Sequence, residues 1–231
     1  MATFSVLLIT APPTGQMEEA GGAFMKIDGR EALLRSVELF LNRDNVKQIQ
    51  LAFLKEAMEE AKRKYGGHLG FSGVKVIQGG PHWLDQIAAA AETLAAEATH
   101  VLVHDAARPA VPYTDLEALM SAAEQHEAVV LTSPVRTALI EVDEGGNALA
   151  SHPPRQFQHL LMPHAFSRER FLKMAKSKQE VHASELHLVK GSPLNVRVGG
   201  PGDVSMVKAM LNMLPKPKIK APSSPFEEAQ W

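Results

Sequence analysis

Short apolar runs alternate with longer amphipathic stretches along the amino-terminal half of the chain. The apolar runs are rich in β-branched residues, and they predict buried strands at residues 4–10, 48–53, 74–77, 100–105 and 128–132. The stretches between them predict helices at residues 31–41, 55–64, 85–98 and 115–126. Strands that alternate with helices of this length predict an α/β fold, with a mostly parallel sheet and helices on both faces.

The pattern changes after Pro134. Two short segments, residues 139–143 and 148–151, flank the turn sequence Glu144-Gly-Gly-Asn147, and this arrangement predicts a β-hairpin. A hairpin inserted into a parallel α/β fold is an appendage. We place this arm at about residues 135–160 and expect it to pair subunits.

Helical patterns return beyond the hairpin. We expect a helix at residues 167–178 with Ser167 as its N-cap, a strand at residues 194–198, and a last helix at residues 203–214 that Pro201 opens. Three methionines of that last helix recur at helical spacing, which favours a buried face over a binding groove. They are Met206, Met210 and Met213.

The end of the chain is rich in proline. Four prolines fall within residues 215–225, and proline is excluded from the interior of helices and sheets. We therefore expect residues 215–231 to form an extended or disordered tail. Residues 1–214 are expected to form a single domain that carries the arm.

Composition excludes several classes of protein. The chain has 231 residues, which suits one α/β domain with an appendage, and it contains no cysteine, which excludes disulfides and thiolate metal sites. A formal net charge of −2 argues against nucleic acid or a membrane surface as a general partner. No stretch approaches the roughly 20 apolar residues of a membrane span, and the first apolar run lacks the basic flank of a signal peptide. We therefore expect a soluble, cytoplasmic protein.

One polar string carries candidate chemistry. His104-Asp-Ala-Ala-Arg-Pro109 closes the predicted strand at residues 100–105, and ligands of parallel sheets bind beyond the carboxyl ends of strands. Asp105 can hold a divalent cation, and Arg108 can bind a phosphate through its planar fork. The alternative is that Asp105 and Arg108 only pair with each other. The ten histidines of the chain show no compact zinc-ligand spacing.

This string, preceded by Val-Leu-Val, resembles the signature of the methylerythritol-phosphate cytidylyltransferases, and the related ribitol-phosphate cytidylyltransferases carry a similar string. Other segments resemble that family in the same order along the chain, from about residue 4 to residue 214. They are residues 24–30, Gly79-Gly80 with Asp85, residues 134–136, residues 163–166, and residues 195–198 with Pro201 and Asp203.

The resemblance implies a Rossmann-like nucleotidyltransferase sheet, a homodimer formed through the arm, and the use of Mg²⁺. It implies transfer of a cytidylyl group from CTP to a sugar-alcohol phosphate in isoprenoid precursor synthesis, with release of pyrophosphate. It also implies roles for individual residues. The catalytic residues would be Lys26, Asp105 and Arg197, and Asp105 would also bind the metal. The nucleotide would contact Gly15, Gly79, Gly80, Asp85 and Ala106. The second substrate would contact Arg108 and Arg155.

The first loop departs from the family pattern. The family reads approximately Ala-Ala-Gly-x-Gly-x-Arg, followed by a lysine, whereas this chain reads Thr10-Ala-Pro-Pro-Thr-Gly-Gln-Met17. Its two prolines lack N–H groups, and no lysine or arginine occurs from Met1 through Met25. Gly22 falls near the position of the family's lysine. Lys26 is the candidate to replace that lysine, with a solvated surface lysine as the alternative.

Further departures follow. Trp83 stands for the arginine and Gln86 for the serine of the Gly-Gly segment, and Trp83 is expected to pack rather than to stack on a base. Arg155 and Arg197 remain as phosphate contacts, or as solvated surface charges. Three interpretations stay open: a divergent nucleotidyltransferase, a weak or inactive relative that binds a nucleotide or sugar phosphate, and a structural or partner-binding homodimer. The missing loop cations favour the second.

Overall fold

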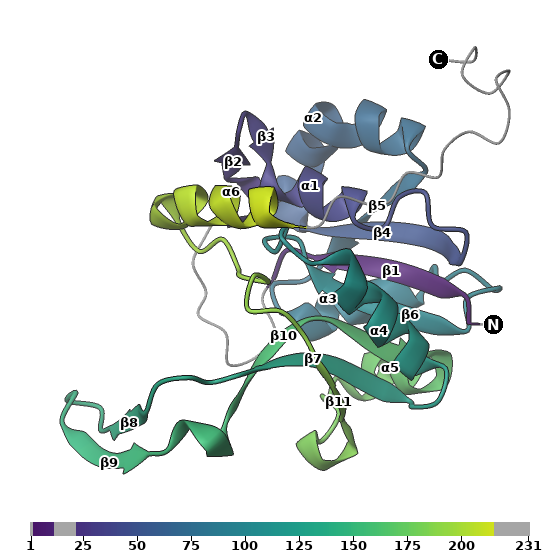
Figure 1. The fold of residues 1–231 in the computed structure, drawn as a ribbon. Coiled ribbons are helices and arrows are strands. Elements are labelled where there is room, and N and C mark those ends of the chain that lie inside the picture. The colour runs from purple at the N-terminus through teal and green to yellow at the C-terminus, as the bar shows by residue number, and fades with distance from the viewer. Residues whose placement is uncertain (1, 12–21, 215–231) are drawn as a thin grey trace, which may run out of the picture.

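The computed structural model describes residues 2–11 and 22–214 (Figure 1). Gly15, which the sequence suggests as a nucleotide contact, lies outside the described residues, and so does the proline-rich segment 215–231. No helix within the described residues is both long and apolar enough to cross a membrane.

Seven strands form one mixed sheet in the order β11-β7-β10-β6-β1-β4-β5. All neighbouring pairs are parallel except the two pairs that involve β10. The α/β fold with a mostly parallel sheet is therefore confirmed. The strands are β1 (Phe4–Ile9), β4 (Val46–Leu54), β5 (Val74–Gly79), β6 (His100–Asp105), β7 (Ala128–Pro134), β10 (Gln158–Ser167) and β11 (His187–Lys190).

Helices pack on both faces of this sheet (Figure 1). Successive side chains of a strand point to opposite faces, so β1 contributes Val6 and Leu8 to one apolar cluster and Leu7 and Ile9 to the other. The first cluster includes α1, α2 and α4, and the second includes α3 and α5. The helices are α1 (Ala32–Glu38), α2 (Met58–Phe71), α3 (Trp83–Ala91), α4 (Tyr113–Ala123), α5 (Arg168–Ser177) and α6 (Val204–Met213).

The predicted hairpin is confirmed. β8 (Leu139–Val142) and β9 (Ala148–His152) pair antiparallel and form a separate two-stranded sheet that extends away from the body of the molecule (Figure 1). The predicted N-cap is confirmed as well, because Ser167 Oγ accepts a hydrogen bond from the backbone N–H of Arg170. The predicted strand positions of the amino-terminal half also hold, whereas α3 ends at Ala91 and not at residue 98.

The strand predicted at residues 194–198 is wrong. These residues are irregular, and the strand that extends the sheet is β11, just upstream. The alternating apolar residues of 194–198 are not paired in a sheet; Val198 instead packs in a small cluster with Val207 of α6, and its N–H donates to the carbonyl of Ala107. β10 was missed because Pro163 and the polar residues at its start conceal the strand pattern.

The buried methionine face predicted for the last helix is also wrong. Val207 is the buried residue of α6, whereas Met206 is exposed and Met213 is 67% exposed. Val204 and Leu211 are partly buried beside Val207. The helix therefore buries the stripe at positions 204, 207 and 211, which has the same helical spacing but lies on a different face from most of the methionines.

Candidate active site

Asp105 is the centre of the candidate site. It is the last residue of β6, at the carboxyl end of the parallel strands, and its side chain is 1% exposed. Its Oδ1 accepts a hydrogen bond from the N–H of Ala107 at 2.9 Å, and its Oδ2 accepts one from Nε of Arg197 at 2.8 Å. Nε of Arg108 lies 3.7 Å from the same Oδ2. We call Asp105, Arg108 and Arg197 the Asp105 cluster.

The turn after β6 is fixed by small residues and backbone hydrogen bonds. Ala106 and Ala107 are fully buried, and the N–H of Ala106 donates to the carbonyl of Ile9 at the end of β1. Ser36 Oγ of α1 donates to the carbonyl of Ala106 at 2.9 Å. The hydrogen bond from Val198 to Ala107, at 2.8 Å, brings the neighbouring Arg197 to Asp105. Larger side chains at the two alanine positions would push these segments apart.

Two buried histidines lie beside the Asp105 cluster. Burial lowers the pKa of His104 and of His164 to about 4, so both are neutral near pH 7. His104 Nε2 lies 2.9 Å from the carbonyl of Arg108, which can only accept, so Nε2 carries the proton. Arg108 Nη1 donates to the carbonyl of Asn195 at 3.0 Å, and the amide of Asn195 donates to the carbonyl of Met162. This hydrogen-bonded layer holds Arg108 in place.

The charge of the cluster suits an anion. One carboxylate faces two guanidinium groups, which leaves a net positive charge at the sheet end. The pairing of Asp105 with Arg108 that the sequence left open is present, but Arg197 is the nearer partner of the carboxylate. Guanidinium groups at the carboxyl end of a parallel sheet are suited to bind phosphate oxygens, and Nη1 of Arg108 already donates to the carbonyl of Asn195.

The same geometry does not fit a metal ion held by protein ligands. No group of three or more His, Cys, Asp or Glu side chains within residues 2–11 and 22–214 is placed to hold a metal. Both oxygens of Asp105 already accept hydrogen bonds, from Ala107 and Arg197. Magnesium needs six oxygen ligands, so an ion bound here would take most of them from phosphate groups and water.

The Gly-Gly segment lies near the end of β5, on the other side of β1. Gly80 approaches Asp85 so closely that an added Cβ would lie 2.6 Å from the Cβ of Asp85. Asp85 Oδ1 accepts from Lys178 Nζ at 2.6 Å, and this partner lowers the pKa of Asp85. Asp85 therefore already has a cationic partner, Lys178, directly after α5.

Two buried side chains of α3 follow these glycines in the sequence. Trp83 packs in the apolar cluster under α3 and donates from Nε1 to Glu180 Oε1 at 3.1 Å, so its expected packing role is confirmed. Gln86 is 0% exposed and bonds to Thr10, Ala11 and Gly80. Sequence reasoning treated Gln86 only as a departure from a family pattern, because its partners are distant in the sequence.

Comparison with known proteins identifies the family. Residues 6–213 match the family model described as IspD: 2-C-methyl-D-erythritol 4-phosphate cytidylyltransferase. The chain belongs to the 2-C-methyl-D-erythritol 4-phosphate cytidylyltransferase family. A relative of that name from Rhodopirellula baltica is 27% identical, over 91% of this chain and 96% of the relative, and one from Clostridioides difficile is 23% identical, over 94% and 98%.

Solved structures of this family share the fold. The 2-C-methyl-D-erythritol 4-phosphate cytidylyltransferase from Thermus thermophilus superposes with a TM-score of 0.70 at 22% identity. The superposition covers 90% of this chain and 98% of the Thermus chain. The 4-diphosphocytidyl-2C-methyl-D-erythritol synthase from Anaerococcus prevotii superposes with a TM-score of 0.71 and 16% identity, over 91% and 96%. At these identities the likeness supports the fold alone.

Two residues that the family resemblance suggests lie apart from the Asp105 cluster. Lys26 is exposed on β2 (Lys26–Ile27), where it faces Glu31 of β3 (Arg30–Glu31). Arg155 is exposed in the short 3-10 helix Pro154–Gln156, at the end of β9 in the arm. Neither residue has a hydrogen bond or ion pair with Asp105 among the described residues.

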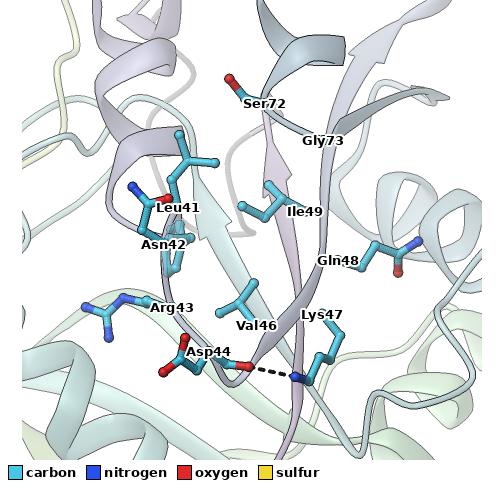
Figure 2. Close-up of a pocket in the computed structure, with 11 residues that line it drawn as sticks. Leu41, Asn42, Arg43, Asp44, Val46, Lys47, Gln48, Ile49, Ser72 and Gly73 are labelled. Atoms are coloured by element: carbon cyan, nitrogen blue, oxygen red, sulfur yellow. Dashed lines mark hydrogen bonds between the residues drawn. The ribbon is translucent and has the colours of Figure 1, made fainter. Parts of the chain in front are cut away.

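A separate hollow of about 450 Å³ lies at the opposite end of the sheet, where β4 begins (Figure 2). Its lining cations are engaged locally. Lys47 Nζ donates to the carbonyl of Asp44 at 2.7 Å, and Arg43 pairs with Glu117 at 2.6 Å. Because it lies at the amino end of the parallel strands, this hollow is not the nucleotide site of a family whose fold places ligands at the carboxyl ends.

Proposed function

We propose that this chain binds the phosphate of 2-C-methyl-D-erythritol 4-phosphate at the Asp105 cluster, and that its cytidylyltransferase activity with CTP is impaired. The family membership and the names of its relatives motivate the substrate pair. The observation that carries the binding is the placement of Arg108 and Arg197 beside the single carboxylate of Asp105. A phosphate dianion there would meet the net positive charge of the cluster.

The reaction requires charge stabilisation at two places. A phosphate oxygen of the sugar phosphate attacks the α-phosphorus of CTP, a new P–O bond forms, and the bond to the β-phosphate breaks to release pyrophosphate. Mg²⁺ bound to the phosphates of the nucleotide would neutralise part of their charge. Arg108 and Arg197 can orient the attacking phosphate. The departing pyrophosphate also needs cations, and the family resemblance assigns their supply to the first loop.

The sequence of the first loop contains no lysine or arginine. No lysine or arginine precedes Lys26, and Pro12 and Pro13 have no N–H to offer. Gly22 cannot be replaced by a lysine in this structure, because a Cβ there would lie 1.8 Å from the carbonyl oxygen of Val198. One lost cationic contact to a transition state costs about 3 kcal/mol, or roughly a hundredfold in rate, so two would reduce turnover by about four orders of magnitude.

The arm supports assembly into a homodimer. A two-stranded hairpin is at best marginally stable alone, and this one exposes apolar side chains that a partner would cover. A second copy of the chain fits, because a self-complementary contact would bury the same residues from both arms. The exposed apolar residues are Leu139, Ile140, Val142 and Leu149.

Calorimetric titration of the sugar phosphate into the full-length protein tests the proposed binding. Saturable binding to the wild type is expected, with at least a tenfold loss in Arg197→Ala and a smaller loss in Arg197→Lys, which keeps the charge. Arg63→Ala, which removes an exposed arginine of α2, provides a matched arginine deletion outside the candidate site. Equal binding by the wild type and by Arg197→Ala would refute the assignment of the phosphate to this cluster.

A further inference from the structure

Gln86 uses all the hydrogen-bonding capacity of its amide at the ends of two strands. Its Oε1 accepts from the backbone N–H of Thr10 at 3.0 Å and from that of Ala11 at 3.4 Å. Its Nε2 donates to the carbonyl of Gly80 at 3.2 Å and to Thr10 Oγ1 at 3.4 Å. Two N–H donors can only be met by the amide oxygen, so the orientation of the amide is fixed.

The partners of Gln86 are backbone groups that the fold places at the ligand end of the sheet. Thr10 and Ala11 follow β1, and Gly80 follows β5, both at carboxyl strand ends. The stem of Gln86 also lies directly on Gly79, where an added Cβ would be 2.6 Å from Cγ of Gln86. The stem of Gln86 thus lies against a glycine, and its amide satisfies two adjacent N–H groups and one carbonyl.

The Gln86 amide presents one acceptor and one donor side by side to these groups, and the edge of a cytosine ring presents the same pair at N3 and N4. Cytosine offers acceptors at O2 and N3 and a donor at N4. Two backbone N–H groups could meet the acceptors while one backbone carbonyl met the N4 amino group. The uracil ring has a donor at N3 and an acceptor at O4, so it offers the wrong pattern to the same groups.

Side-chain length decides whether these backbone groups are available. The family resemblance places a serine at position 86, and a serine side chain has two heavy atoms where glutamine has five. A serine would leave the N–H groups of Thr10 and Ala11 and the carbonyl of Gly80 beyond its reach. In this chain the amide of Gln86 forms hydrogen bonds with these N–H groups and with the carbonyl, and Gln86 has no exposed surface.

We propose that Gln86 closes a cytosine-binding pocket by occupying, with its own amide, the backbone groups that would recognise the base. Gln86 is then a specificity-determining residue whose exchange for a shorter side chain opens the pocket. The choice of a cytosine ligand rests on the proposed function, because it follows from CTP as the nucleotide. The closure itself rests on the four hydrogen bonds of the Gln86 amide.

The experiment titrates cytidine, which has no phosphate, into full-length wild type, Gln86→Ser and Gln86→Asn. We expect no saturable cytidine binding by the wild type, binding at least tenfold tighter by Gln86→Ser, and a preference of that variant for cytidine over uridine. Gln86→Asn retains an amide on a shorter stem and serves as a second opened variant if Gln86→Ser does not fold. Folded variants that bind cytidine no better than the wild type overturn the proposal.

A wild-type measurement tests the closure without any substitution. In ¹⁵N NMR spectra, the side-chain amide of Gln86 should remain unchanged as cytidine is added. Saturable cytidine binding by the wild type with an unchanged Gln86 amide would contradict the closure. Titration of the sugar phosphate into the same samples separates the two proposals. If Gln86→Ser binds cytidine but not the sugar phosphate, only the proposed function is refuted. If it binds the sugar phosphate but not cytidine, only the closure is refuted.

Discussion

Arg197 reaches Asp105 from an irregular segment 92 residues further along the chain, and its Nε donates to Oδ2 across 2.8 Å. Both groups are largely buried, so each depends on the other for its solvation. The phosphate binding that we propose at the Asp105 cluster therefore depends on how residues 194–198 pass over the end of β6.

Replacing Arg197 should affect stability as well as binding. Among the described residues, Arg197→Ala leaves the buried Asp105 with Arg108 as its ion-pair partner, and we expect a loss of about 1–3 kcal/mol in the free energy of unfolding. Urea denaturation of the wild type and the variant measures this loss. In a double-mutant cycle, the losses caused by Arg197→Ala and by Asp105→Asn should not add, because the two side chains share one ion pair in the wild type. Strictly additive losses would mean that the two side chains are not energetically coupled.

Gly22 should be intolerant of any side chain. Gly22→Ala puts a methyl group against the carbonyl oxygen of Val198, so residues 196–198 must shift and Arg197 with them. We expect a lower melting temperature together with weaker sugar-phosphate binding. Gly67→Ala in α2 is the matched control, because nothing lies within 4 Å of its added Cβ, and it should stabilise the helix by up to about 1 kcal/mol. Unchanged binding by folded Gly22→Ala would refute the link to Arg197.

The buried histidines predict a pH dependence of stability. The unfolded chain has histidine pKa values near 6.5, whereas His104 and His164 stay neutral in the folded protein down to about pH 4. Between these pH values the unfolded state binds more protons, so stability is complete above about pH 6.5 and falls as the pH drops toward 4. The shift of one histidine corresponds to about 3 kcal/mol. Urea denaturation across this range measures the slope, and His164→Gln should reduce it. A flat profile would contradict the burial of neutral histidines.

The arm predicts a dimer that a single charge disrupts. Ile140→Glu places a carboxylate among the exposed apolar residues of β8 and β9, and we expect the homodimer to dissociate while the far-UV circular dichroism stays unchanged. Analytical ultracentrifugation measures the mass. Lys47→Glu, at the opposite end of the sheet, serves as the control charge change. A wild-type protein that sediments as a monomer at high concentration would refute the dimer.

The fold was predictable where apolar patterning is local. β1 and β6 are buried on both faces, so each contains a short uninterrupted apolar run, at residues 6–9 and 101–103. The same logic failed at residues 194–198, where alternating apolar residues pack against α6 and Asn195 donates to a carbonyl of β10. β10 was missed because a strand with a proline and polar residues is specified by its neighbours β6 and β7 and not by its own pattern.

The site was predictable only in part for a similar reason. Asp105 and Arg108 lie three residues apart, so their meeting followed from one short string. The role of Gln86 depends on Thr10, 76 positions away, and no local pattern reveals that contact. Gly22 has no room for a side chain because the carbonyl of Val198 lies against it. The sequence alone does not show that these two residues are neighbours.

The most direct test of the central claim is pyrophosphate release by the full-length protein with CTP, Mg²⁺ and 2-C-methyl-D-erythritol 4-phosphate, beside Asp105→Asn. Typical enzymes turn over at about 10 s⁻¹, and the loss of two loop cations predicts a rate of about 0.001 s⁻¹. Slow or undetectable release from a protein that still binds the sugar phosphate is the result that we expect. Release near 10 s⁻¹ that is abolished in Asp105→Asn would contradict the impairment and show that other cations serve the departing pyrophosphate.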